Sequence, residues 1–395
     1  MTGSGTTVDA LIREASHFWD QAAVFALPEK ADIPSCGGLP DARKHPLFFE
    51  SAALPYPIPG MSDVMPYQSA VFSQLTRTQL DMYRTQWHDH LIRVLDTFQP
   101  DVIHSHHLWI LSSLLKDIAP HIPVVTHCHG TGLRQLTLCP HLSEEVIAGC
   151  RKNDAFVVLH EVHRTQICSQ FAVPKAAVHV VGAGYRDDVF TFRKENPTSQ
   201  RTLSYAGKLS YAKGVPWLLD AIEIIHRSGE DVHLHIAGAG SGEEGNTLLK
   251  RINAMSHLVT YHGVLPPEAL AAVLQRSHVF VLPSFYEGLP LVLAEASACG
   301  NRLVTTRLPG IVDQLEPVLA PWMSTVPLPD LKNVDQPTPT SAQRFTNDLV
   351  QALMRTFELS PLSPSCESHA AAVRSFKWQS VYEKTDHVWR SISGI

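Results

Sequence analysis

Short apolar runs alternate with longer helical patterns over most of this chain. The strand-like runs are DVIHSHH, PVVTHCHG, AFVVLH and AVHVVGAG in the first half, and RTLSYAG, HLHIAGAG, VTYHG, HVFVLPS and RLVTT in the second. Helical patterns such as WILSSLLKDIAP, VPWLLDAIEIIHRSG and PEALAAVLQRS separate them. This alternation is typical of parallel sheets joined by crossover helices. The sequence therefore predicts an α/β fold made of doubly wound, Rossmann-like domains.

The length of the chain favours two such domains. With 395 residues the chain can bury two separate cores. A polar, turn-rich segment, YRDDVFTFRKENPTSQR, interrupts the alternation just after Gly184. We therefore expect an N-terminal domain over residues 1–184 and a second domain over residues 185–375, facing each other across a cleft. Open α/β sheets bind ligands at the carboxyl ends of their strands, so the site is expected there.

Composition narrows the classes of partner. The net charge is −6 and hydrophobic residues make up 44% of the chain, so nothing indicates a nucleic acid partner. No apolar run reaches transmembrane length and no signal peptide is evident. The seven cysteines include no C-x-x-C pair, which fits reduced thiols. These features predict a soluble, cytoplasmic protein without a membrane partner.

Two segments do not fit the alternating pattern. Residues 40–66 are dense in proline and aromatic side chains, and they show neither a strand nor a helix period. We interpret them as a packed or functional surface loop. Its aromatic residues could line a binding pocket or pack against a sheet; they are Phe48, Phe49, Tyr56 and, just beyond, Tyr67. The opening MTGSGTTVDALIREA resembles a glycine loop that leads into a helix without a preceding strand, so either a first strand is missing or the GSG is a flexible end.

The segment SFYEGLPLVLAEASACG carries two carboxylates in an otherwise apolar stretch. HVFVLPS before it reads as a buried strand, and LVLAEASACG reads as a helix that Gly300 ends. Pro290 suits the first helical turn, where a missing N–H costs nothing. Glu287 is then expected in the turn above a strand end and Glu295 in the helix. A lone pair of acids fits solvated side chains as well as it fits a site.

Two lysines follow the strand RTLSYAG. Gly207 ends this strand, and Lys208 and Lys213 lie around the short turn before the next helix. Ammonium groups near a helix N-terminus suit an anionic ligand. The glycine-rich turn AGAGSGEEG on the next strand lacks the spacing of a dinucleotide fingerprint, and it is a weak signal alone.

Four histidines are expected on two neighbouring strands. Strand alternation puts His104 and His106 on one face, and it does the same for His127 and His129. Zinc favours nitrogen ligands, so a zinc-dependent hydrolase built on these four residues is one alternative. Packed, hydrogen-bonded histidines are the other interpretation. The chain contains no D-x-D pair, which argues against Mg²⁺ or Mn²⁺ held by carboxylates.

In their order along the chain, these motifs resemble the family 4 retaining glycosyltransferases of the GT-B fold. The segments that carry the resemblance are DVIHSHH, VVTHCHG, VVGAGYRDDVF, AGKLSYAKGVPWLLDAI, HIAGAGSGEE, TTRLPGIVDQL and the E-x7-E signature in VLPSFYEGLPLVLAEASACG. The closing FKWQSVYEKTDHVWRSI, within residues 376–395, resembles the family's last helix, which crosses back to the N-terminal domain. The resemblance spans roughly residues 101–395 and implies a GT-B fold with donor binding in the second domain.

The resemblance also implies roles for individual residues. Glu287 is expected to bind the hydroxyls of the donor sugar, and Glu295 to bind the nucleotide ribose. Lys208 and Lys213 are expected to stabilise the departing diphosphate, which leaves no need for a metal. His129 is expected near the reacting face of the sugar. Backbone around the turns completes the expected donor-binding set, which is Gly207, Gly288, Leu289, Pro290 and Leu291.

The resemblance implies transfer of a hexose-type sugar from a UDP- or GDP-sugar to a small-molecule acceptor, with retention of configuration. A catalytically inert protein that only binds nucleotide sugars is the second alternative. Three departures from the family pattern stand out. Lys208 replaces an arginine, Arg186 replaces an aspartate, and Asn301 with Arg302 replaces an apolar–proline pair. Lysine offers a point charge where arginine offers a bidentate contact.

Overall fold

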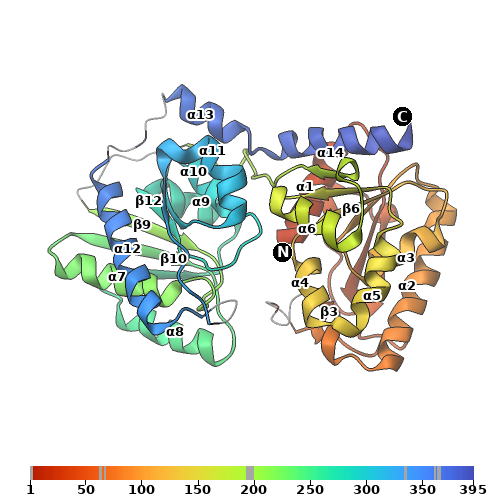
Figure 1. Ribbon diagram of the computed structural model, residues 1–395, viewed down its shortest axis with the longest axis horizontal. Helices are drawn as coiled ribbons and strands as arrows, with labels where there is room; N and C mark the ends of the chain where they lie inside the picture. The colour runs from red at the N-terminus through yellow and green to blue at the C-terminus, as the bar shows by residue number, and fades with distance from the viewer. Residues whose placement is uncertain are drawn as a thin grey trace. The chain divides into compact units, whose positions relative to one another are not determined.

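A computed structural model describes residues 3–61, 65, 68–192, 200–332, 336–359, 362 and 366–395. The chain forms two compact units. Unit 1 combines the chain up to Gly182 with Trp378–Ile395, and unit 2 is Ala183–Lys377. Unit 1 runs from red to yellow in Figure 1, with the final helix in dark blue, and unit 2 runs from green to blue. None of the helices in the described ranges combines the length and hydropathy needed to cross a membrane.

Unit 1 contains a four-stranded parallel sheet in the order β5-β6-β7-β8. Its strands are β5 (Ile103–His106), β6 (Val124–Cys128), β7 (Ala155–Val158) and β8 (Val178–Val180). The helices that follow these strands are α3 (Ile110–Ile118), α4 (Thr131–Leu138), α5 (Pro140–Cys150) and α6 (Glu161–Phe171). Every residue of β6 and β7 is buried, as expected for strands covered on both faces. The predicted α/β class with parallel sheets is confirmed.

The first part of unit 1 differs from the sequence expectation. The opening glycines lie within helix α1 (Gly3–Ala15), so the interpretation of residues 3–5 as a flexible end is wrong. The alternative of a missing first strand stays a prediction. Strand β1 (Ala23–Pro28) follows and pairs in parallel with β2 (Lys44–Phe49). The expectation that residues 40–66 contain no strand is therefore wrong as well. In the part of the chain that the structure describes, β1 and β2 form a sheet of their own, separate from β5–β8.

The aromatic residues of this segment mostly pack in the core. Phe49 is fully buried, and its ring meets that of Tyr56 edge-on at 5.9 Å between centroids. The Tyr56 hydroxyl donates to the Gln79 carbonyl oxygen at 2.8 Å, on helix α2 (Arg77–Phe98). Phe48 is exposed, and Tyr67 lies outside the described residues. Packing, rather than the lining of a pocket, is the role that these contacts give to Phe49 and Tyr56.

The last helix, α14 (Trp378–Ser393), belongs to unit 1 although it follows unit 2 in the chain. The indole N–H of Trp19 donates to Asp386 Oδ1 at 2.6 Å, and Phe18 stacks on Tyr382 at 5.9 Å. Trp389 Nε1–H donates to His104 Nδ1 on β5 at 3.0 Å. These contacts attach α14 both to the chain after α1 and to the four-stranded sheet.

Unit 2 is a six-stranded parallel sheet in the order β11-β10-β9-β12-β13-β14. Its strands are β9 (Arg201–Ala206), β10 (Val232–Ala237), β11 (Val259–Gly263), β12 (Val279–Leu282), β13 (Arg302–Thr306) and β14 (Met323–Val326). Its longer helices are α7 (Val215–Arg227), α8 (Gly242–Ala254), α9 (Pro267–Arg276), α10 (Leu291–Ala298), α12 (Pro339–Phe357) and α13 (Glu367–Arg374), and they cover both faces of the sheet (Figure 1).

This strand order is that of a doubly wound dinucleotide-type sheet. The chain starts at β9, proceeds outward to β11, then returns past β9 to β12 and continues to the other edge. The order therefore reverses between β9 and β12. Ligands of such sheets bind outside the carboxyl ends of the two strands at this switch point, which directs attention to the turns after β9 and β12.

Candidate active site

The turns after β9 and β12 pack against each other. Phe285 N–H, in the turn after β12, donates to the Ala212 carbonyl oxygen in the turn after β9 at 2.9 Å. Gly214 precedes α7 with φ of +70°, and a Cβ there would lie 2.0 Å from the Pro283 carbonyl oxygen. Only glycine allows both this backbone conformation and this approach. The close contact brings the predicted lysine turn beside the predicted glutamate turn.

Two of the predicted site residues form an ion pair across these turns. Lys213 Nζ lies 2.7 Å from Glu287 Oε1 and donates to the Tyr286 carbonyl oxygen at 3.2 Å. The side chains of Lys213 and Glu287 are 25% and 15% exposed, so water only partly screens the pair. A cation and an anion are thus fixed at the switch point, the cation suited to a phosphate and the anion to hydroxyl groups.

Lys208 follows β9 with its side chain exposed, and it makes no ion pair with the residues that the structure describes. Its backbone is held instead. The buried Tyr205 donates its hydroxyl to the Lys208 carbonyl oxygen at 2.7 Å. The ammonium group is therefore free to move while its Cα position is fixed, and it can reach an anion at the mouth of the turn.

Gly207 lies where the ends of β9 and β10 come together. Its N–H donates to the Ala237 carbonyl oxygen at 3.0 Å, and a Cβ on Gly238 would lie 1.8 Å from the Gly207 carbonyl oxygen. The glycine-rich turn after β10 therefore lets the backbones at the ends of β9 and β10 approach each other closely.

Glu244, in the first turn of α8, was not predicted from the sequence. Its Oε1 accepts a hydrogen bond from Tyr211 N–H at 2.5 Å, and this bond fixes the turn that carries the two lysines. The paired acids in the EEG segment were the available signal.

Glu295 lies in α10, as the sequence predicted, four residues after the helix begins at Leu291. Gly288 and Leu289 are half-buried in the turn before it, and Pro290 is buried at its N-cap. Burial raises the pKa of the Glu295 carboxyl to about 7. This carboxylate makes no hydrogen bond or ion pair with the described residues, so a ligand that offers hydroxyl donors would stabilise its charged form.

Two buried hydroxyl groups at this edge of the sheet lack a partner. Ser284 Oγ follows β12 and Thr306 Oγ1 ends β13, and neither has a hydrogen-bond partner among the described residues. By contrast, the neighbouring Thr305 hydroxyl donates to the Leu282 carbonyl oxygen at 2.9 Å. Buried polar groups are nearly always paired, so two unpaired hydroxyls at the strand ends mark a place where a polar ligand can bind.

Asn301, one of the departures from the family pattern, has a structural role. It is fully buried, its Nδ2 donates to the Leu274 carbonyl oxygen at 2.7 Å, and its Oδ1 accepts from Ser204 Oγ at 3.4 Å. Asn301 therefore joins the end of α9 to strand β9 beneath the switch point. Arg186, another departure, pairs with Asp188 at 2.6 Å at the surface.

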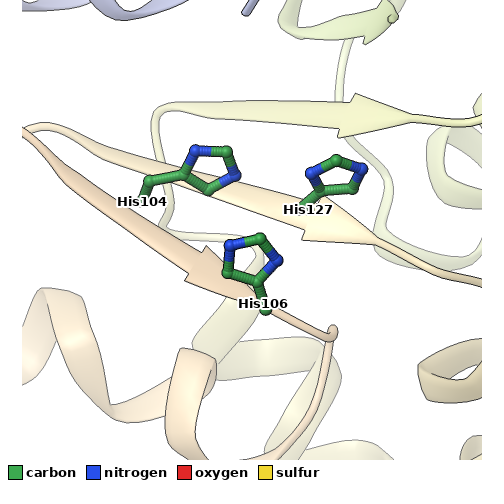
Figure 2. A group of neighbouring side chains, drawn as sticks. All are labelled: His104, His106 and His127. Carbon is green, nitrogen blue, oxygen red and sulfur yellow. The ribbon is translucent and has the colours of Figure 1, made fainter. Parts of the chain in front are cut away.

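In unit 1 the four predicted histidines come together, as Figure 2 shows for three of them. The rings stack with centroid separations of 4.7 Å for His104–His106, 5.4 Å for His106–His127 and 4.3 Å for His127–His129. His106 Nδ1 and His129 Nε2 lie 2.9 Å apart and share one proton. Burial lowers the pKa of His104 to about 3, and burial with the neighbouring imidazoles holds the pKa values of the other three well below the usual range. Burial thus favours the neutral form of all four rings.

Comparisons with known proteins agree with these two units. Residues 72–189 match the family model described as Glycosyltransferase Family 4, and residues 200–322 match the model described as Glycosyl transferases group 1. A glycogen synthase of Mycobacterium tuberculosis is 29% identical over 224 residues, 54% of each chain. A D-inositol 3-phosphate glycosyltransferase of Corynebacterium jeikeium is 27% identical over 240 residues, 53% of this chain and 57% of the relative. The chain thus matches little more than half the length of these relatives.

A solved structure shares the fold over nearly the whole chain. Anabaena HepE, in complex with UDP and glucose, superimposes with a TM-score of 0.64 at 14% identity, and the alignment covers 99% of this chain and 96% of that protein. The parallel α/β units and these matches define a GT-B glycosyltransferase fold, which confirms the fold expected from the sequence. The two matched family models together span more than half of the chain. The chain belongs to the family 4 glycosyltransferases.

Proposed function

We propose that this protein is a retaining, metal-independent glycosyltransferase that moves a hexose-type sugar from a UDP- or GDP-sugar to a small-molecule acceptor. The observation that carries the proposal is the Lys213–Glu287 pair at the switch point of unit 2. Sugar transfer requires that charge on the departing diphosphate be stabilised while the sugar hydroxyls are held. The ammonium group and the carboxylate supply these two functions side by side.

Each predicted residue then has a distinct role. Lys213 and the exposed Lys208 bind the diphosphate, and Glu287 accepts hydrogen bonds from the sugar hydroxyls. Glu295 accepts from the ribose hydroxyls. Backbone of the two turns borders the donor at Gly207, Gly288, Leu289, Pro290 and Leu291. By the family resemblance, His129 of unit 1 acts at the reacting face of the sugar.

The proposed reaction keeps the configuration of the anomeric carbon. The bond from this carbon to the β-phosphate oxygen breaks, and a bond to the acceptor oxygen forms on the same face. The acceptor proton passes to the departing phosphate oxygen, so no covalent enzyme intermediate is needed. In this scheme the two lysines provide the charge stabilisation that a metal ion supplies in other transferases.

The relatives support the substrate classes without fixing them. One relative acts on inositol 3-phosphate, a small polar acceptor, and HepE was crystallised with UDP and glucose. Another is named for glycogen synthesis. The comparisons do not favour the zinc-dependent hydrolase. An experiment must therefore distinguish the proposed transferase from a catalytically inert protein that only binds nucleotide sugars.

The test combines binding with turnover. Thermal unfolding is measured with UDP, GDP, ADP and their common sugar conjugates, with and without EDTA, because a ligand that binds the native state raises its stability. Release of UDP or GDP is then measured with a panel of small polyols and sugar phosphates. We expect one nucleotide class to stabilise the protein independently of EDTA, and turnover to follow.

Lys213→Met is the decisive variant, and Lys250→Met on the exposed surface of α8 is its matched control. We expect the first to lose at least about 100-fold in turnover, a typical loss for one group that stabilises developing charge, and the second to keep wild-type activity. Binding without turnover on any acceptor would favour the inert binder. Equal activity of both variants would refute the role of the ion pair.

A further inference from the structure

Three histidine side chains of unit 1 form a compact group of nitrogen donors. His104 and His106 lie on β5 and His127 lies on the adjacent β6, and we call these three residues the histidine cluster (Figure 2). One ring nitrogen from each residue lies within 4.8 Å of the others. In Figure 2 the three rings lie side by side, and they stack with interplanar angles of 5°, 16° and 21°. None of these three residues has a role in the proposed transfer reaction.

Several nitrogens of the histidine cluster are buried without a hydrogen-bond partner. Among the described residues these are Nε2 of His104 and both ring nitrogens of His127. A buried polar atom without a partner costs free energy that a folded protein rarely leaves uncompensated. A neutral imidazole has one lone pair and one N–H, so a cation can satisfy one nitrogen of His127 directly and Nε2 of His104 only after the proton of that ring has moved.

We propose that His104, His106 and His127 bind a divalent cation of the zinc type. Three imidazoles with a water molecule in the fourth position are an established ligand set for zinc. With Zn–N bonds of about 2.0–2.1 Å, tetrahedral geometry places ligand nitrogens about 3.4 Å apart. The three nitrogens must therefore close from separations of up to 4.8 Å, and the stacked rings must turn so that their in-plane lone pairs point to one position.

The surroundings of His106 support binding. His106 Nδ1 lies 2.9 Å from His129 Nε2. A cation on Nε2 of His106 puts the remaining ring proton on Nδ1, which then donates to His129. Histidines that bind metals commonly donate their second N–H to such an acceptor. Cation binding would thus fix the tautomer of His129; this consequence rests on the proposed function, whereas the cation site itself does not.

The hydrogen bond from Trp389 to His104 opposes cation binding. Its indole N–H donates to His104 Nδ1, so in the neutral ring the proton of His104 lies on Nε2, the nitrogen that faces the cluster. A cation on Nε2 moves this proton to Nδ1, where two N–H groups would point at each other. The Trp389 hydrogen bond must therefore break when the cation binds. Removing the indole N–H should strengthen cation binding.

The test is titration of the purified protein with Zn²⁺ by isothermal calorimetry, with X-ray absorption to identify the ligands. We expect one equivalent to bind, with nitrogen or oxygen neighbours at about 2.0–2.1 Å. His127→Gln should weaken binding at least about 100-fold, the upper end of losses from residues that merely support ligands. Trp389→Phe should tighten it by up to about tenfold, the value of one ordinary hydrogen bond.

His235→Gln is the matched control, because His235 lies 3.1 Å from His262 in a second histidine group on β10 and β11. It should leave the titration unchanged. Circular dichroism reports whether the fully buried His127→Gln variant folds, and His106→Gln serves in its place if it does not. Absence of binding, binding retained in a folded cluster variant, or binding lost in His235→Gln would each overturn the proposal. None of these readouts depends on transferase activity.

Discussion

The buried carboxyl of Glu295 should make the stability of this protein fall as the pH rises. Burial raises its pKa from 4.5 to about 7 in the folded state. Each pKa unit corresponds to about 1.4 kcal/mol, so burying the charge costs at most roughly 3 kcal/mol. Between pH 4.5 and 7 the folded state binds more protons than the unfolded state. The cost is therefore absent below pH 4.5, grows through this window and is complete above pH 7.

Glu295→Gln should remove this pH dependence, because glutamine keeps the shape of the side chain without its charge. At pH 8 we expect the variant to be more stable than the wild type by up to about 3 kcal/mol, and at pH 4.5 we expect the two to be nearly equal. Chemical denaturation followed by circular dichroism at a series of pH values measures the difference. Glu243→Gln, at an exposed position on α8, is the control and should show no such trend.

Nucleotide binding should respond in the opposite direction. If the charged form of Glu295 accepts hydrogen bonds from the ribose, affinity falls as the carboxyl is protonated, by up to tenfold per pH unit below pH 7. In Glu295→Gln the affinity should be weaker and nearly independent of pH. Calorimetric titration with UDP and GDP from pH 5.5 to 8.5 measures both slopes. For the unfolding experiment, a difference in stability between the wild type and Glu295→Gln that stays constant from pH 4.5 to 8 would refute the argument from burial.

Two further substitutions test how the framework is held. Gly214→Ala should lower the free energy of unfolding by at least about 1–3 kcal/mol, because its new Cβ would strike the Pro283 carbonyl oxygen. Gly229→Ala is the control, since Gly229 has φ of +98° but no atom within 4 Å, and it should lose only the energy of backbone strain. Chemical denaturation measures both variants. Equal losses would mean that the contact with Pro283 is unimportant. Trp19→Phe should lose the hydrogen bond to Asp386 and destabilise unit 1 by about 1.5–3 kcal/mol. Hydrogen exchange of the backbone amides in α14 measures this loss, and unchanged protection of those amides would contradict the prediction.

The sequence predicted the repeating part of the fold because the signal is local there. Strands β5 to β7 and β9 to β13 are short runs in the sequence, and each of them is followed by a helix. Strands β1 and β2 escaped notice because β1 ends in Pro28 and β2 contains Pro46, which locally argue against strands. Their pairing depends on residues about twenty positions away, which no local pattern records.

The sequence identified candidate site residues by their type and their position after strands, and the structure adds the contacts between them. The sequence predicted that Lys213 and Glu287 lie in turns after strand ends, and the structure adds that these strands flank the switch point and that the two side chains pair. The sequence marked Asn301 as a departure and offered the EEG acids as a signal for Glu244, but their roles lie in hydrogen bonds to the backbone of Leu274 and Tyr211, which no sequence pattern predicts. In the sequence, Asn301 looks like an unexplained departure from the family pattern and Glu244 looks like an exposed acid.

The attachment of α14 to unit 1 has a consequence for biosynthesis. Unit 2 is one unbroken stretch, Ala183–Lys377, and all of its strands have left the ribosome before Trp378 emerges. Unit 1 must wait for that final segment before Trp19 and His104 acquire their partners. During synthesis the nascent unit 1 therefore presents uncovered aromatic surface for the whole time needed to translate unit 2. That interval, rather than the stability of the finished protein, is when a chaperone or a slow codon would matter most.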